Sequence, residues 1–450
     1  MSENIKLKKG LNIRIKGHAE KILSPEIPVT HYAVKPVDFP GLVPRLSVKP
    51  GDIVKAGTAL FSDKFNPEIV VTSPVSGKVV EAVRGERRKL LEITIEAAGN
   101  DFIDFGKADV STLGREEITR RLLESGLWPV IRQRPYHIIA RPDVMPKSIF
   151  ISGFDTAPLA PDYDFIMHNS DRAEFNTGIS ALAKLTDGKV NLVLDGSNMT
   201  GSVLKNTPGV DIHFLSGPHP AGNVGIQIHH IDPVNKGETV WYVNLQDVAV
   251  IGRLFAEGVY RHDKIIALAG SEVQKPGYYR IRSGASVAGI AKANIKAGDV
   301  RYISGNVLTG TAIRPDGYLG FYDNMVAVIP EGRYHEFFGW ITPGLDKFSA
   351  TKTFMSSLLP RKEYVHDTNL HGGERAFVLT GVYDKVLPMD IFPMHLLKSI
   401  LAGDIEMMEK LGIYEVAEED FALCEYVCPS KIEIQAIVRK GIDLMIKEMS

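Results

Sequence analysis

The pattern of apolar and polar positions divides the chain into parts with different periods. Residues 1–100 carry short apolar runs broken by glycine and proline, which predicts short strands joined by tight turns. Further along, the apolar runs Ser148–Ser152, Val190–Leu194 and Asp211–Leu215 alternate with segments of helical period. Strands that alternate with helices predict a parallel α/β sheet in this part of the chain.

Helical periods are clearest in three places. Residues 115–125 repeat apolar side chains at helical spacing and stop at Gly126, and residues 245–257 form a second amphipathic pattern. After about residue 385 the chain becomes mostly helical, and Ser430 with Glu433 has the spacing of a capping box before the last helix. The C-terminal part is therefore expected to be a small helical bundle.

A chain of 450 residues is too long for one hydrophobic core, so several domains are expected. We predict an α/β multi-domain protein with four parts. They are a β-sandwich at 1–100, a parallel Rossmann-like α/β domain at 101–262, a β-rich β-grasp unit at 263–330, and a connecting segment with C-terminal helices at 331–450.

Composition narrows the class of protein. The chain has 52 basic and 54 acidic residues, so nothing in the charge balance points to nucleic-acid binding. The N-terminus lacks the apolar stretch of a signal peptide, and no run approaches about 20 consecutive apolar residues. We expect no transmembrane segment, and any role at a membrane is expected to depend on partners.

The stretch from Leu46 to Val80 is similar to a biotinyl/lipoyl-type barrel-sandwich hybrid. Gly51 and Gly57 are placed for tight turns between short strands. Lys64 follows Asp63 where a lipoyl domain carries its modified lysine, so a lipoyl-type carrier module is one alternative. The second Gly-Asp-x-Val element of such domains is replaced by Arg84–Leu91, which favours an unmodified, solvated lysine.

An aromatic and arginine-rich segment follows the first predicted helix. It contains Trp128, Arg132, Arg134 and Tyr136 on a proline-bounded stretch. Arginine and tryptophan both stack on planar rings, so the segment could contact an aromatic or anionic ligand. A packed inter-domain linker is the alternative interpretation.

A glycine-containing loop follows the third predicted strand. Gly217, Gly222 and Gly225 could let backbone N–H groups approach a phosphate at a helix start, although their spacing matches neither G-x-G-x-x-G nor Walker A. The loop is therefore a candidate nucleotide-binding loop. The nearby histidines lack metal-site spacing, so we predict no metal: His213, His219, His229 and His230.

Two further segments resemble known modules. Val273, Pro276 and Gly277 match the turn of the soluble-ligand-binding β-grasp domain.

Cys424 and Cys428, followed by proline, match the tail of a ferredoxin-like cluster motif. Because such a cluster needs four thiolates and the chain has only these two cysteines, it cannot hold one by itself. A redox disulfide is an alternative, and cysteines this few suit a reducing compartment.

Several separate motifs together resemble one family. They are Pro74–Val80 with Arg84-Gly85, Gly126–Pro129 with Arg134–Tyr136, Gly217–Gly222 and Leu423–Pro429. Over essentially the whole chain, the sequence is similar to the A subunits of sodium-translocating NADH:quinone oxidoreductases. It is more distantly similar to the C subunits of Rnf complexes and to the NADH-binding flavoprotein subunit of respiratory complex I.

The resemblance implies a role within a larger complex. That complex passes electrons from NADH through FAD, FMN, riboflavin and iron–sulfur centres, held in partner subunits, to quinone, and it exports sodium. This chain is expected to hold no flavin or cluster of its own. It is expected to act as a quinone-interacting scaffold on the cytoplasmic face of the bacterial inner membrane, against the membrane-embedded B subunit. An Rnf-type electron-transfer subunit is the alternative.

If a quinone head group binds here, it needs a planar apolar slot with a few donors. Two segments are candidates, and no catalytic side chain is predicted. The candidate residues are Asp38, Phe39 and Gly41 in the first segment, and Trp128, Arg132, Arg134 and Tyr136 in the second.

Overall fold

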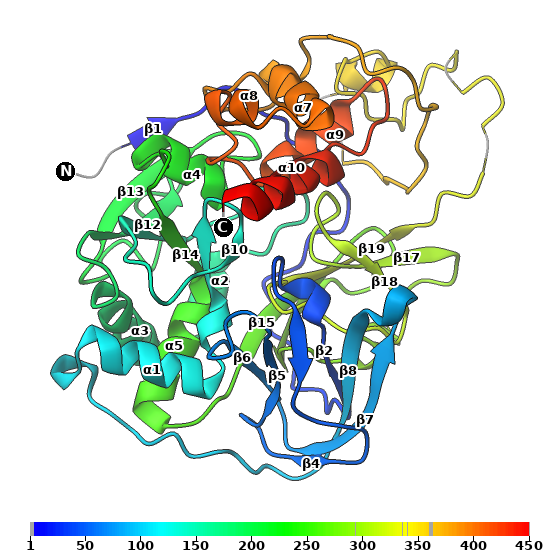
Figure 1. Ribbon diagram of the computed structural model, residues 1–450. Helices are drawn as coiled ribbons and strands as arrows, with labels where there is room; N and C mark the ends of the chain where they lie inside the picture. Colours follow the sequence, from blue (N-terminus) through cyan, green and yellow to red (C-terminus); the bar gives the residue numbers. More distant parts are fainter. Residues whose placement is uncertain (1–3, 293, 335, 340, 360–362, 450) are drawn as a thin grey trace.

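The computed structural model describes residues 4–449 except 293, 335, 340 and 360–362. Its strands form four sheets, and the C-terminal helices cover one end of the molecule (Figure 1). Within the described residues, no helix combines the length and the apolar character needed to cross a bilayer.

The N-terminal barrel-sandwich consists of two small sheets. The first sheet has the order β2 (His31–Val34), β8 (Leu90–Ala97), β7 (Gly77–Arg84) and β4 (Ile53–Val54); the second has β3 (Pro44–Leu46), β5 (Ala59–Asp63) and β6 (Val70–Thr72). Successive side chains of a strand point to opposite faces of the sheet, so apolar and polar residues on β8 alternate between core and surface. Ile93 and Ile95 are fully buried, whereas Glu92 and Glu96 are not. The expected turns at Gly51 and Gly57 are present, both at positive φ.

The largest sheet has seven strands. Its order is β1 (Asn4–Lys6), β13 (Asp211–Ser216), β12 (Lys189–Asp195), β11 (Ser148–Ser152), β14 (Val240–Asn244), β9 (Ile131–Arg134) and β10 (Ile138–Ile139). The first five are parallel, which confirms the parallel sheet predicted from the apolar runs of β11, β12 and β13, and β9 and β10 add an antiparallel edge.

The first strand lies elsewhere than expected. Residues 1–100 were assigned to the sandwich, but β1 pairs in parallel with β13 at the edge of the large sheet (Figure 1). The amide of Leu7 extends this pairing by donating to the carbonyl of Ser216 at 2.8 Å. A strand can join the edge of a sheet through backbone hydrogen bonds alone, so a strand of three residues can pair there. Its side-chain pattern does not need to alternate, and the sequence therefore does not predict it.

The helices of this region are α1 (Arg115–Ser125), α2 (Tyr163–His168), α3 (Arg172–Ala183), α4 (Val224–Ile231) and α5 (Leu245–Glu257). Helices α3, α4 and α5 pack against the large sheet, on β12, β11 and β14 respectively, whereas α1 contacts β6 of the sandwich. The α3 and α5 backbones touch at two glycines: a Cβ on Gly178 would lie 1.9 Å from the carbonyl oxygen of Val248, and one on Gly252 would lie 1.7 Å from that of Glu174. The predicted helices at 115–125 and 245–257 are confirmed, each ending at a left-handed glycine.

The domain after this sheet contains a five-stranded mixed sheet and corresponds to the predicted ligand-binding β-grasp type. Its order is β16 (Gly277–Arg282), β15 (Asp263–Ala269), β19 (Met325–Pro330), β17 (Val300–Ser304) and β18 (Thr311–Ile313), with the short helix α6 (Ala288–Ala291). Strands β15 and β19 are parallel and the other pairs are antiparallel. The loop from β18 to β19 carries Phe321 and Tyr322 toward the other domains.

The C-terminal helices are α7 (Pro393–Ala402), α8 (Ile405–Lys410), α9 (Ala422–Val427) and α10 (Ile434–Met449). The expected capping box of the last helix is not formed. The Ser430 hydroxyl instead donates to the carbonyl of Ala376, and the amide of Gln435 donates to the Glu425 carboxylate at 2.8 Å. A partner from another helix has therefore replaced the local cap.

Candidate functional site

The first predicted segment is fixed against the β18–β19 loop. Asp38 ends a short 3-10 helix, Pro36–Asp38, and its carboxylate accepts the amide of Phe321 at 2.8 Å. The Phe39 ring is 2% exposed and packs on Phe321 and Tyr322, with centroids 4.9 and 5.8 Å away. These contacts join the N-terminal sandwich to the β-grasp domain.

The second segment reaches the same loop through Arg132. Its guanidinium lies between the rings of Tyr322 and Tyr242, 4.2 and 4.7 Å from their centroids. One guanidinium nitrogen also contacts His137 Nε2 at 2.8 Å. The Tyr322 hydroxyl donates to the carbonyl of Pro129 at 2.7 Å. Tyr322 therefore connects the two predicted segments.

Sequence reasoning did not identify Tyr322 or Tyr242 as site residues. Tyr322 lies in a loop, and Tyr242 lies in the buried strand β14, which the sequence pattern did not predict. No local spacing marks either residue, because their role depends on Arg132 reaching both rings.

Trp128 lies in the interior of the protein. It is fully buried, its indole N–H donates to the carbonyl of Ala140 at 2.7 Å, and its ring packs edge-on against Trp241. Gly41, in the first segment, is also closely packed, because Ile138 lies 3.2 Å from where its Cβ would be. A ligand could touch Trp128 only after these neighbours moved, so in this arrangement Trp128 serves as packing.

Arg134 uses its donors on acidic side chains of the chain itself. The guanidinium is fully buried and pairs with Glu419 at 2.8 Å and Asp420 at 3.1 Å, both from the turn Glu418–Phe421. Burial by itself lowers the pKa of Arg134, but Asp420, Tyr242 and Glu419 outweigh it and hold that pKa above the ordinary value. Tyr136 stands beside this cluster, its ring 6.3 Å from that of Tyr414.

The glycine loop is filled by protein atoms. A Cβ on Gly225, at the start of α4, would lie 2.6 Å from a carboxylate oxygen of Asp420 and 2.9 Å from Arg134. A Cβ on Gly222 would meet Thr156 at 2.5 Å, and one on Gly217 would meet Leu7 at 2.8 Å. The space beside the start of α4, where a phosphate was expected, is therefore occupied by the Asp420 carboxylate and the Arg134 guanidinium of the same chain.

The surroundings of Asp38 leave little room for a ligand. Burial raises the pKa of Asp38 to about 6, although Lys35 and the Phe321 amide act in the opposite direction. A cavity of about 10 Å³ adjoins the carboxylate, with Lys35, Thr72 and Tyr260 among its lining residues. That volume suits about one water molecule, whereas sites for drug-sized ligands span roughly 300–1,000 Å³.

The remaining candidates occupy separate places. Cys424 and Cys428 are buried free thiols, and burial raises the pKa of Cys424 far above its ordinary value. Lys64 is exposed in the turn after β5. Each of the four histidines contacts a different neighbour. His213 contacts Asn191, His219 contacts Thr156, His229 contacts Glu415, and His230 contacts the carbonyl of Pro388. In the described part of the chain, no group of three or more potential ligands could hold a metal ion.

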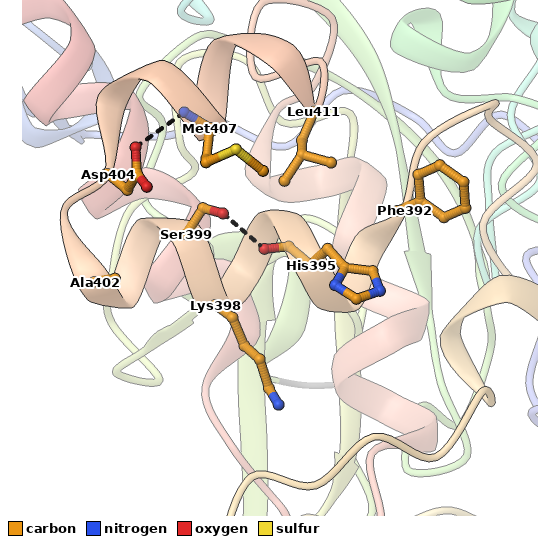
Figure 2. Close-up of a pocket in the computed structure, with 8 residues that line it drawn as sticks. All are labelled: Phe392, His395, Lys398, Ser399, Ala402, Asp404, Met407 and Leu411. Carbon is orange, nitrogen blue, oxygen red and sulfur yellow. Dashed lines mark hydrogen bonds between the residues drawn. The ribbon is translucent and has the colours of Figure 1, made fainter.

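An open groove of about 450 Å³ lies over α7 and α8, away from these residues. Figure 2 shows Phe392, His395 and Lys398 on one side and Met407 and Leu411 on the other. Sequence analysis did not identify this groove, because it is formed by the angle between two helices.

Three family descriptions match successive parts of the chain. "NqrA N-terminal barrel-sandwich hybrid domain" matches residues 5–98, "NqrA second alpha/beta domain" matches 113–260, and "NQRA C-terminal domain" matches 265–314. One NAD⁺-reducing [NiFe]-hydrogenase structure aligns with 75% of this chain and 64% of its own, at 11% identity. Its TM-score of 0.37 is too low to carry an argument.

Full-length relatives agree with these matches. The chain is 43% identical to the A subunit of the Na(+)-translocating NADH-quinone reductase of Yersinia pseudotuberculosis, over 97% of this chain and 98% of that protein. It is 40% identical to the corresponding A subunit of Neisseria meningitidis serogroup A, over 99% and 100%. The chain therefore belongs to the family of Na(+)-translocating NADH-quinone reductase A subunits.

Proposed function

We propose that this chain is a scaffold subunit of the sodium-translocating reductase that contacts quinone but carries no electrons itself. It lies on the cytoplasmic face of the bacterial inner membrane, against the membrane-embedded B subunit. Flavins and iron–sulfur centres belong to partner subunits, and no side chain of this chain acts as a catalyst.

The observation that carries this proposal is the carboxylate at the start of α4. The order β13-β12-β11-β14 has the strand sequence of a Rossmann-like half, whose ligands bind beyond the strand ends. At that place Asp420, held by Arg134, lies against Gly225. The Arg134–Asp420 ion pair fills the space that a flavin or nucleotide phosphate would need, so the domain serves as framework and not as a cofactor site.

The quinone-contacting part of the proposal centres on the junction built around Tyr322. Phe39 and Arg132 pack on this ring from two domains, and the arrangement supplies planar groups with nearby donors. Because the adjoining cavity is so small, a quinone head group enters only if the β18–β19 loop moves. Quinone binding is then linked to a change in how the sandwich, the large sheet and the β-grasp domain contact one another.

Titration calorimetry of the purified subunit with a short-chain quinone tests this part. Arg132→Lys removes the planar guanidinium while keeping the charge, so the Kd should rise about tenfold. Arg253→Lys is the control, since Arg253 is a buried arginine that pairs with Glu174 on α3, away from the junction. Equal effects of the two variants, or no saturable binding by the wild type, would remove quinone contact and leave only the scaffold role.

Two alternatives have direct tests. An Rnf-type electron-transfer subunit would retain iron or flavin after purification, and a visible absorption spectrum with iron analysis detects either. A lipoyl-type carrier would be modified at Lys64, which intact mass detects. We expect an unmodified chain without visible absorbance; stoichiometric iron or flavin would overturn the non-redox role.

A further inference from the structure

The segment between β19 and α7 exposes an unusual number of large apolar side chains. Twelve of the 25 such side chains in the described part lie within residues 334–379, about a tenth of the chain. We call these residues the apolar segment. Its exposed members are Tyr334, Phe337, Phe338, Ile341, Leu345, Met355, Leu358, Leu359, Val365, Leu370, Val378 and Leu379.

The backbone of the apolar segment is attached to the body of the protein at several points. Tyr364 is 7% exposed, bridges to Ile15, and exchanges backbone hydrogen bonds of 2.9 Å with Arg14 and Lys16. Further along, the amide of Arg375 donates to the carbonyl of Ser430 at 3.0 Å. Figure 1 shows the described parts of the segment on the outside of the molecule, near the C-terminal helices. The Tyr364 hydroxyl also donates to the carbonyl of Ser356 at 3.3 Å, so the exposed side chains near these points lie on a part of the segment that is held against the protein.

The charge of the apolar segment favours a protein over a lipid surface. Residues 334–379 contain five acidic and five basic residues, so the segment is neutral apart from its histidines. Segments that bind bilayer surfaces usually carry an excess of lysine and arginine that attracts anionic headgroups. Apolar and aromatic side chains without a basic excess are typical of the buried centre of a protein–protein interface.

The size of the apolar segment also suits a stable interface. Standard interfaces bury about 800 Å² on each partner, contributed by about 20–30 residues. Twelve large exposed side chains with their neighbours reach that scale. Phe337, at 87% exposed, and Leu358, at 76%, could insert into the partner as anchors.

We propose that the apolar segment is the surface by which this chain docks onto another subunit of its complex, through an apolar and near-neutral face of that subunit. This inference rests on the proposed function as a scaffold. It deepens that function by assigning the contact to the described exposed residues between Tyr334 and Leu379.

Co-purification of the complete complex tests the docking surface. The triple variant Phe337→Ser, Ile341→Ser and Leu358→Ser removes three exposed side chains, so the amount of this chain recovered with its tagged partners should fall about tenfold. The matched control is Ile22→Ser, Ile53→Ser and Phe65→Ser, which are 59%, 78% and 70% exposed elsewhere on the surface. The control should assemble normally, and both purified variants should keep the wild-type melting temperature.

The outcomes separate the two proposals. If the wild-type chain fails to co-purify with other subunits, the proposed scaffold function is wrong. If the wild type and the triple variant assemble equally well, only the docking surface is wrong. Binding of the wild-type protein, but not the triple variant, to vesicles of phosphatidylethanolamine and phosphatidylglycerol would overturn the protein partner in favour of the bilayer.

Discussion

At the scale of single residues, the pKa of a buried carboxylate in this protein depends on whether a positively charged side chain lies close to it. The Asp247 carboxylate is fully buried, and burial by itself raises its pKa. Lys264 and His262, 3.4 and 2.8 Å away, nevertheless lower that pKa to about 2. Burial dominates at Asp38 and raises its pKa to about 6, against the weaker opposing effects of Lys35, at 3.8 Å, and the Phe321 amide.

This contrast predicts opposite effects of pH on two variants. Between pH 4 and pH 6 the folded protein binds more protons at Asp38 than the unfolded chain does, so its contribution to stability falls as pH rises. Asp38→Asn should therefore raise the Tm relative to wild type at pH 8, and the gain should disappear toward pH 4. Thermal melts followed by circular dichroism across this range measure the difference.

Asp247→Asn is the control of opposite sign. Its pKa is lowered, so the ionised carboxylate stabilises the fold above about pH 4, and the variant should melt below wild type at pH 8. If Asp38→Asn melted at or below the wild-type temperature at pH 8, Asp38 would not be an uncompensated buried charge.

At the scale of elements, the start of α4 and the turn Glu418–Phe421 hold each other in place. The Asp420 carboxylate accepts the amide of Ala417 at 2.9 Å and pairs with Arg134, so it cannot swing away from Gly225. The absence of a side chain at Gly225 is what allows this approach.

Gly225→Ala should accordingly destabilise the protein. The added methyl would lie 2.6–2.7 Å from both Asp420 oxygens, and overpacking of this kind costs about 1–3 kcal/mol. Alanine gains about 1 kcal/mol over glycine within a helix, so the net loss should be in the lower part of that range. Urea unfolding measures it. Gly373→Ala, with open space around it, is the control, and equal midpoints for both variants would contradict the contact.

At the scale of the whole molecule, the hydrophobic cores do not follow the domain boundaries. One continuous cluster contains Ile93 of the sandwich, Ile149 of the large sheet and Ile266 of the β-grasp domain. A second cluster joins the other face of the large sheet to the C-terminal helices through residues such as Tyr242 and Ile442. No domain can therefore unfold without exposing part of a core shared with its neighbours.

We expect the described domains to unfold together. Differential scanning calorimetry of the purified protein should give one endotherm, with the calorimetric enthalpy close to the van 't Hoff enthalpy. Two or more resolved transitions would mean that the shared core contributes little to stability across the domain boundaries.

The sequence by itself determined the features whose signals are local. A glycine that ends a helix, as at Gly126 and Gly258, acts through its own backbone, and the parallel strand Ser148–Ser152 is apolar because both faces are covered. The motifs that assign the family are likewise contiguous. The quinone contacts remain predictions.

Only the tertiary structure decided the chemistry of the candidate site. Arg134 meets Asp420 from 286 positions away, Phe39 meets Phe321 across two domains, and β1 joins a sheet whose neighbouring strand begins at Asp211. No local pattern records such pairings. In the sequence, an arginine that donates to a ligand and one that forms a buried ion pair look the same. Which of the two Arg134 is depends on whether the fold brings a distant carboxylate to it.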